Sequence, residues 1–236
     1  MIHILSGENM AIYTFYLDKE DYFNSKKYMF LKKTVGNLAQ IINQYLVVAK
    51  GINEVYISGA CWGKCENKVQ DLITESFVGL NRSEITINLV GKYKGYSYEK
   101  TKTVLMKEKY HVHTFFFSKK SDHRKMIFFI KDSIVQAVLI GSSNYSPNTY
   151  LKHLSSEADV LMIDANGSAN TEVVETIKKL KKDVNGIYRE NIPDDLISKN
   201  LSEKYNYPVI SETIVCPDDF LQKVFNAYCS KISPNL

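Results

Sequence analysis

The chain has 236 residues, of which 44% are hydrophobic, and its formal net charge at pH 7 is only +4. This length and apolar content can supply a proper core and exclude a disordered chain. The weak charge excludes capture of an anionic partner by a global field, so a nucleic acid would need a local basic surface.

The apolar runs, such as Met126 to Ile130, are too short to cross a bilayer, and the N-terminus does not resemble a signal peptide. We therefore expect a soluble, cytoplasmic protein with no membrane partner. The chain has four cysteines, for which free thiols are expected. Cys61 and Cys65 are separated by three residues and have no second Cys or His pair nearby, so we expect no metal site and no cofactor.

The first half of the chain alternates between strand and helix patterns. Strands are expected over 1–5, 10–17, 53–60, 84–90 and 111–118, and helices over 38–49, 68–80 and 98–109. The first two strands surround a turn and could form an opening hairpin. The alternation predicts an α/β fold whose sheet is mixed or parallel.

The second half continues this pattern. Met126 to Ile130 and Ile134 to Ile140 are apolar arms separated by a polar turn, which predicts a hairpin buried on both faces. Further elements are expected as a strand over 159–163, a helix over 171–190, a strand over 209–215 and a helix over 218–230. We predict a single domain over 1–236, with a helical appendage from about residue 165 as the alternative.

The residues around the hairpin suit attack on a phosphodiester. His123 and Lys125 are two positions apart, so an extended backbone puts imidazole and ammonium on one face. Lys125, Ser142 and Asn144 could donate to phosphate oxygens, whose negative charge must be matched in the transition state. A neutral His123 imidazole could attack phosphorus if an acceptor such as Glu157 fixed its tautomer.

This pattern resembles the motif of the phospholipase D superfamily, which reads His-x-Lys, an apolar strand, Gly-Ser-x-Asn and a later acid. The resemblance implies a phospholipase D-like mixed β-sheet flanked by helices. It also implies that His123 is the nucleophile, that Lys125 and Asn144 hold phosphate, that Ser142 supports them, and that Glu157 is the later acid. The match covers about forty residues by motif.

The chain departs from the family pattern in two respects. The aspartate of the motif would fall at position 130, which is Ile130, while Asp132 lies two residues later. Among the five histidines only His123 is followed two places on by a lysine, so the chain carries one half-site. Relatives with one motif pair two subunits, one histidine attacking and the other protonating the leaving oxygen, so we predict a homodimer with one composite site.

Other residues allow more than one interpretation. His111 and His113 are at strand spacing and could bind a metal or belong to the site, although flanking a core strand is the simpler reading. Lysines and tyrosines alternate from Lys92 to Lys100, which suits either a solvated loop or contact with nucleic acid. The basic residues that could border a nucleic-acid groove are Lys92, Lys94, Lys119, Lys120 and Arg124.

By resemblance, we predict a metal-independent nuclease that cleaves nucleic acid, DNA rather than RNA, through a covalent phosphohistidine. A role in restriction or phage defence, beside a helicase or other partner, would fit. Two alternatives stay open. One is a phospholipid phosphodiesterase or transferase. The other is an inactive nucleic-acid-binding or scaffolding subunit, which is retained because Ile130 replaces the aspartate of the motif.

Overall fold

The structure is a computed structural model that describes residues 8–17, 28–91, 98–119, 122–152, 157–177, 210–216 and 219–234. The strands are β1 (Glu8–Leu17), β2 (Tyr28–Phe30), β3 (Lys33–Val35), β4 (Glu54–Ser58), β5 (Thr86–Gly91), β6 (His111–Phe117), β7 (Met126–Lys131), β8 (Ile134–Gly141), β9 (Glu157–Asp164), β10 (Ile210–Cys216) and β11 (Ile232–Pro234). The helices are α1 (Leu38–Val48), α2 (Glu66–Phe77), the 3-10 turn η1 (Arg82–Glu84), α3 (Glu99–Lys107), α4 (Pro147–Tyr150), a helix over 171–177 and α7 (Phe220–Cys229).

Nine strands form one mixed sheet in the order β10-β1-β9-β8-β7-β4-β5-β6-β11, while β2 and β3 pair separately. β4, β5 and β6 are parallel, and every other pair is antiparallel. The predicted α/β class with a mixed sheet and flanking helices is therefore confirmed. The expected strand over 1–5 and the end of the helix expected over 171–190 lie outside the described residues.

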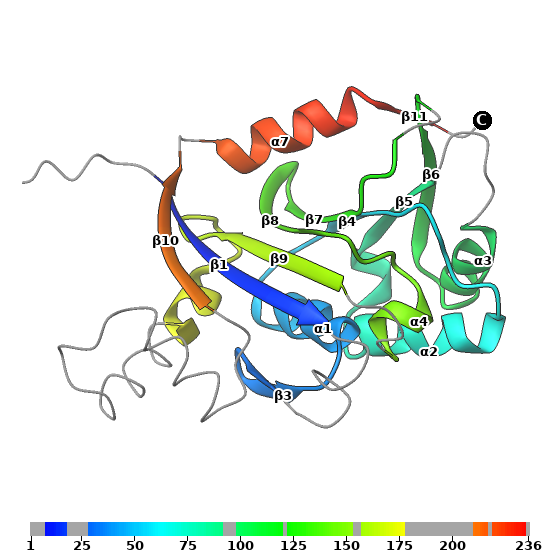
Figure 1. The fold of residues 1–236 in the computed structure, drawn as a ribbon, viewed down its shortest axis with the longest axis horizontal. Coiled ribbons are helices and arrows are strands. Elements are labelled where there is room, and N and C mark those ends of the chain that lie inside the picture. The colour runs from blue at the N-terminus through cyan, green and yellow to red at the C-terminus, as the bar shows by residue number, and fades with distance from the viewer. Residues whose placement is uncertain are drawn as a thin grey trace, which may run out of the picture.

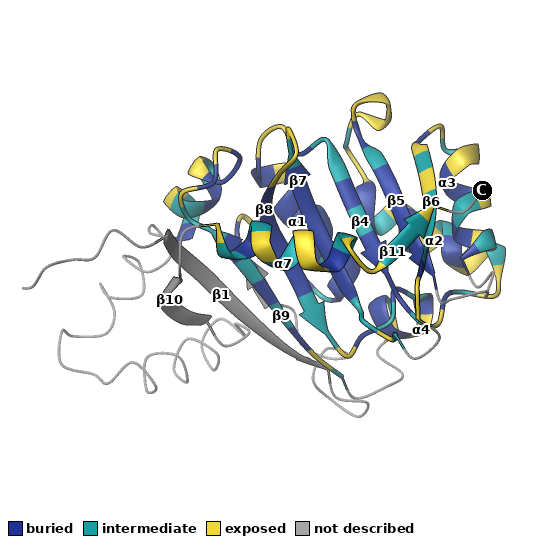
Figure 2. Ribbon diagram, turned by 90° about the horizontal axis from the view of Figure 1, so that it is seen from above, coloured by how far each residue is buried: buried dark blue, intermediate teal, exposed yellow. Residues whose placement is uncertain are grey.

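Helices cover both faces of the sheet, with α1, α2 and α4 on one side and α7 on the other (Figures 1 and 2). Strand alternation divides the core accordingly: Ile127 and Phe129 of β7 join the larger core, and Phe128 and Ile130 join the smaller one. β10 and β11 are the two outermost strands of this sheet. None of the described helices has the length and apolar character needed to cross a membrane.

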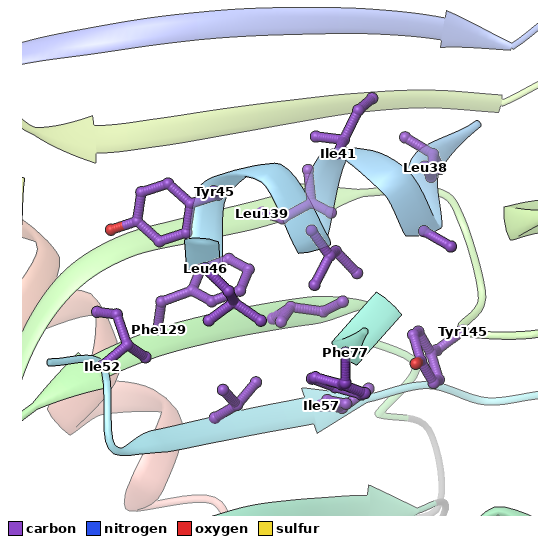
Figure 3. Packing of buried hydrophobic residues seen from close by; sticks show 14 of the residues in the cluster. Leu38, Ile41, Tyr45, Leu46, Ile52, Ile57, Phe77, Phe129, Leu139 and Tyr145 are labelled. Carbon is purple, nitrogen blue, oxygen red and sulfur yellow. The ribbon is translucent and has the colours of Figure 1, made fainter. Parts of the chain in front are cut away.

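The larger core is built around α1. Asn37 caps this helix by accepting a 2.9 Å hydrogen bond from the backbone N–H of Gln40. Tyr45 packs on Phe129 with ring centroids 4.7 Å apart, and Leu139 of β8 lies beside the same helix (Figure 3). The Tyr45 hydroxyl donates over 2.7 Å to Asn170, which satisfies its polar atom inside the core. This packing fixes the central strands against the helical layer.

The predicted hairpin forms, and it holds both residues of the motif's unusual part: Asp132 lies in the turn and Ile130 in the strand before it. Asp132 and Ser133 connect β7 to β8, and both have positive φ, 50° and 69°, as a two-residue hairpin turn of type I′ requires. Asn53 donates over 2.9 Å to the Asp132 carboxylate and accepts from its backbone N–H over 3.1 Å. Ile130 lies just before this turn, fully buried in the smaller core.

Placing the motif's aspartate back at position 130 would bury an unpaired carboxylate. We expect Ile130→Asp to lower the free energy of unfolding by at least about 3 kcal/mol, because an ion or a polar group without a partner is costly in a core. Urea denaturation at pH 7 measures this. Ile134→Asp is the matched control, since Ile134 is 58% exposed and should tolerate the same change. Equal stability of the two variants would contradict the burial of residue 130.

Candidate active site

The candidate site lies at one edge of the sheet, where β7 and β9 begin and β4 and β8 end. The register pairs Met126 with Ile140 and Gly141 with Asp159, so residues just before β7 lie beside those just after β8 and those that open β9. We call this the site edge. Five residues predicted from the sequence lie there, namely His123, Lys125, Ser142, Asn144 and Glu157.

His123 and Lys125 immediately precede β7. The Lys125 carbonyl accepts a 3.3 Å hydrogen bond from the backbone N–H of Gly141, so the strand ladder continues as far as this lysine. The Lys125 ammonium donates to the backbone carbonyl of His123 over 3.0 Å, which leaves two of its three N–H bonds for another acceptor. His123 is exposed, as a nucleophile must be. The structure therefore places the Lys125 ammonium at the backbone of the exposed histidine.

Asn144 ties the end of β8 to the end of β4. Its Oδ1 atom accepts from the backbone N–H groups of Ala60 and Cys61, each over 3.0 Å. Two donors can face only the oxygen of a carboxamide, so they fix the orientation of the side chain. Within the described part of the chain no hydrogen bond uses Nδ2, so this amine is a preorganised donor at the site edge.

A buried acid, which sequence reasoning missed, lies behind these residues. Asp159 is 1% exposed and accepts hydrogen bonds from the hydroxyl and, over 3.4 Å, from the backbone N–H of Ser143. A Cβ atom on Gly141 would lie 1.9 Å from the Asp159 Oδ1 atom, so this glycine is required by close approach. The only sequence signal was an acid at the first position of an apolar strand.

Burial controls the ionisation of this acid. Desolvation raises the pKa of Asp159 to about 6, against the hydrogen bonds from Ser143, and the negative charge of Glu157 adds to the rise. Burial also raises the pKa of Tyr150, with smaller contributions from the charges of Asp159 and Glu157. These shared effects place Glu157, Asp159 and Tyr150 in one neighbourhood behind the exposed groups.

Glu157 opens β9, and Ser142 directly follows β8. Glu157 is half-buried at the site edge, but no hydrogen bond joins it to His123 among the described residues. The Ser142 hydroxyl oxygen accepts from the Ala158 backbone N–H over 3.1 Å, and the Ser142 N–H donates back to the Ala158 carbonyl over 3.0 Å. Ser142 therefore closes the β8–β9 ladder, and its hydroxyl hydrogen is still available to an acceptor.

Of the five basic residues that were expected to border a groove, the structure describes two, Lys119 and Arg124. Lys119 is exposed just after β6, at the site edge. The Arg124 guanidinium instead forms two hydrogen bonds with Asp122, of 2.9 and 2.6 Å, and its Cζ atom lies 5.2 Å from the ring centroids of both Phe117 and Tyr228. Arg124 thus anchors the segment that carries His123 onto α7. Lys92, Lys94 and Lys120 lie outside the described residues.

Two further histidines lie at the other end of the sheet. His111 and His113 are exposed in the first half of β6, which begins opposite the site edge, because β6 is parallel to β4 and β5. They are therefore remote from His123. Among the described residues, no group of three or more His, Cys, Asp or Glu side chains is placed to hold a metal ion.

Comparison with known proteins gives only a distant likeness. No family model matches the chain, and no curated protein matches its sequence. The solved structure of polyphosphate kinase from Porphyromonas gingivalis is similar over 78% of this chain, with a TM-score of 0.40 and 11% sequence identity. The chain spans about a quarter of that protein, since the match covers 24% of it. A likeness this weak carries no argument about function.

The buried acid should make stability depend on pH. Because folding raises the pKa of Asp159 from 3.8 to about 6, the folded chain binds this proton more tightly, and stability should fall as pH rises from about 4 to about 6. Relative to Asp159→Asn, the wild-type protein should lose about 2 to 3 kcal/mol of unfolding free energy between pH 4 and pH 7.

Urea denaturation at several pH values measures this difference. Asp71→Asn is the control, since Asp71 is an exposed carboxylate on α2, and its curve should run parallel to that of the wild type. Parallel curves for Asp159→Asn as well would mean that the buried carboxylate is not the source of the pH dependence.

Proposed function

We propose that the site edge is half of a metal-independent phosphodiesterase of phospholipase D-like fold, which cleaves nucleic acid through a covalent phosphohistidine. One observation carries the proposal: the exposed His123, the Lys125 ammonium that donates to its backbone carbonyl, and the Asn144 carboxamide, whose oxygen two backbone N–H groups fix, all lie at this edge. These groups supply a nucleophile and two fixed donors for phosphate oxygens. DNA is preferred to RNA on the family resemblance alone.

The chemistry proceeds in two displacements at phosphorus. A nitrogen lone pair of His123 forms an N–P bond while the P–O bond to the leaving group breaks, and that oxygen takes a proton from a general acid. Water then attacks the phosphohistidine, gives its proton to the same group, and releases His123 as the N–P bond breaks. Lys125 and Asn144 match the negative charge that grows on the phosphoryl oxygens in both steps.

The general acid would come from a second subunit. A nucleophilic imidazole cannot protonate the leaving group that it displaces, so another acid must face it across the scissile bond. In the described part of the chain, His123 is the one histidine at the site edge, while His111 and His113 lie at the opposite end of β6. A two-fold axis near this edge would bring the partner's copy of the same histidine to the leaving oxygen.

The alternative of an inactive subunit depended on Ile130, and the position of this residue weakens it. Ile130 lies five residues beyond Lys125 in β7, about 17 Å away at the rise of an extended strand. It packs in the smaller core and touches none of the proposed reacting groups. A role in restriction or phage defence, beside a helicase or other partner, remains part of this proposal through the family resemblance.

The catalytic role is tested by incubating the protein with plasmid, single-stranded DNA and RNA in EDTA. We expect cleavage of at least one of these, and a fall of at least about a thousandfold for His123→Ala, because the nucleophile itself is lost. Acid-quenched wild-type protein should carry substrate phosphate on the peptide that contains His123. His113→Ala removes another exposed histidine and should retain activity. If no substrate is cut, or if both variants behave alike, the proposal is wrong.

The shared site makes a separate prediction about subunits. Light scattering should give a mass near twice the 27.0 kDa of the chain. When wild-type and His123→Ala chains are refolded together in equal amounts, activity should fall to about one quarter, because only dimers with two wild-type chains hold both histidines. Retention of about one half would show that each chain works alone and would refute the composite site.

A further inference from the structure

A cleft of about 350 Å³ opens next to the candidate site. It lies between the loop that leads from β4 to α2 and the turn that begins α4, and its walls include Cys61, Trp62, Lys64, Lys68 and Pro147. The volume is within the range of small-ligand sites, about 300 to 1,000 Å³. None of these side chains has a role in the chemistry described above.

The apolar part of the cleft is rigid. Trp62 is 6% exposed, its indole N–H donates to the Gly59 carbonyl over 3.0 Å, and its ring meets those of Tyr98 and Tyr145 edge-on at centroid distances of 6.0 and 6.2 Å. Pro147, the first residue of α4, also lines the cleft. The fixed indole and the proline ring give the cleft an apolar wall, against which a planar base can lie.

The charged part of the cleft is positive. Lys64 and Lys68 are both exposed, and no ion pair engages either ammonium among the described residues. Glu66 lies between these two lysines in the sequence, but its carboxylate is paired with Lys107. α2 begins between the two lysines, so its N-terminal N–H groups add to the positive potential. The cleft therefore combines two uncompensated cations with an apolar wall.

The cleft shares its framework with the site edge. Cys61 lines it, and the backbone N–H of the same residue donates to the Asn144 carboxamide. Ser146 also lines it, and its N–H donates over 2.7 Å to the Asn144 carbonyl. A substrate phosphate held by Asn144 would therefore lie beside a second, separate site for an anion with an apolar portion.

We propose that this cleft binds a neighbouring nucleotide of the substrate chain, with its phosphate on Lys64 and Lys68 and its base against Trp62 and Pro147. This assignment rests on the proposed function, and it favours a polynucleotide over a phospholipid diester that carries a single phosphate. The cleft would contribute to substrate binding and would take no part in the bond-making steps.

Protection of the two exposed thiols in the cleft tests the assignment without any catalysis. N-ethylmaleimide should label Cys61 and Cys65 in the free protein, and adenosine 5′-monophosphate should slow this labelling at least about fivefold by occupying the cleft. Peptide mass spectrometry follows each thiol, with Cys229 as the internal reference. Adenosine and inorganic phosphate should each protect much less than the nucleotide. Equal protection by inorganic phosphate would overturn the role of the apolar wall.

Matched double variants identify the cations. Lys64→Ala/Lys68→Ala should abolish protection by adenosine 5′-monophosphate, because both proposed phosphate contacts are lost. Lys50→Ala/Lys131→Ala removes the same charge from the opposite edge of the sheet, where β4 begins and β7 ends, and should retain protection. No protection of the wild-type protein, or equal protection of both double variants, would overturn the assignment.

A comparison of two substrates separates this assignment from the catalytic proposal. The two substrates are an oligonucleotide and bis(4-nitrophenyl) phosphate, which has no neighbouring phosphate. Lys64→Ala/Lys68→Ala should lower kcat/KM for the oligonucleotide relative to the wild type. This loss should be at least about fivefold larger than the loss for bis(4-nitrophenyl) phosphate. If the protein cleaves neither substrate but the lysines still govern thiol protection, the nucleotide site stands and the nuclease proposal falls. Cleavage of both, with no shift in their ratio, would overturn the nucleotide site.

Discussion

The site edge depends on the burial of one carboxylate, that of Asp159, between the ends of β8 and β9. Gly141 gives this group room, and Ser143 turns inward to hydrogen bond with it. The residues on either side of Ser143 have other partners. Ser142 accordingly closes the ladder to β9, and Asn144 reaches the loop after β4. Three consecutive side chains thus bind the buried acid, the backbone of β9 and the loop after β4.

The two cationic residues that follow His123 point to opposite faces of the sheet. Arg124 points toward the smaller core, where Asp122 pairs with it and the rings of Phe117 and Tyr228 receive its guanidinium. Lys125, one position later, points to the other face, where only the backbone carbonyl of His123 engages it among the described residues. The structural cation is therefore neutralised, whereas the cation proposed to bind phosphate keeps its charge available.

Much of this arrangement could be predicted from the sequence, because it follows from strand periodicity. The hairpin of β7 and β8 is two apolar runs around a polar turn, and its antiparallel pairing alone puts His123 and Lys125 beside Ser142 and Asn144. The inward pair of Ser143 and Asp159 was not predictable in the same way. A serine in a small-residue turn and an acid before an apolar run look exposed, and only the packed strands show that they meet.

Three short strands were not predicted from the sequence, for a related reason. β2, β3 and β11 have three residues each, too few for a periodic pattern to appear, and tertiary pairing alone defines them. β11 pairs with the end of β6, and the helix before it, α7, brings Tyr228 under Arg124. The anchor of the His123 segment therefore comes from the far end of the chain, beyond the reach of any local pattern.

The departure from the family motif has a physical explanation in the hairpin itself. The motif's third position falls in β7 on the face of the smaller core, where Ile130 contributes apolar packing beneath α7. An aspartate is instead found at the turn, as Asp132, where its left-handed backbone and its hydrogen bonds with Asn53 hold the loop to the start of β4. Both positions are at the end of the strand remote from His123. The substitution therefore alters how the hairpin is braced and leaves the groups at the site edge unchanged.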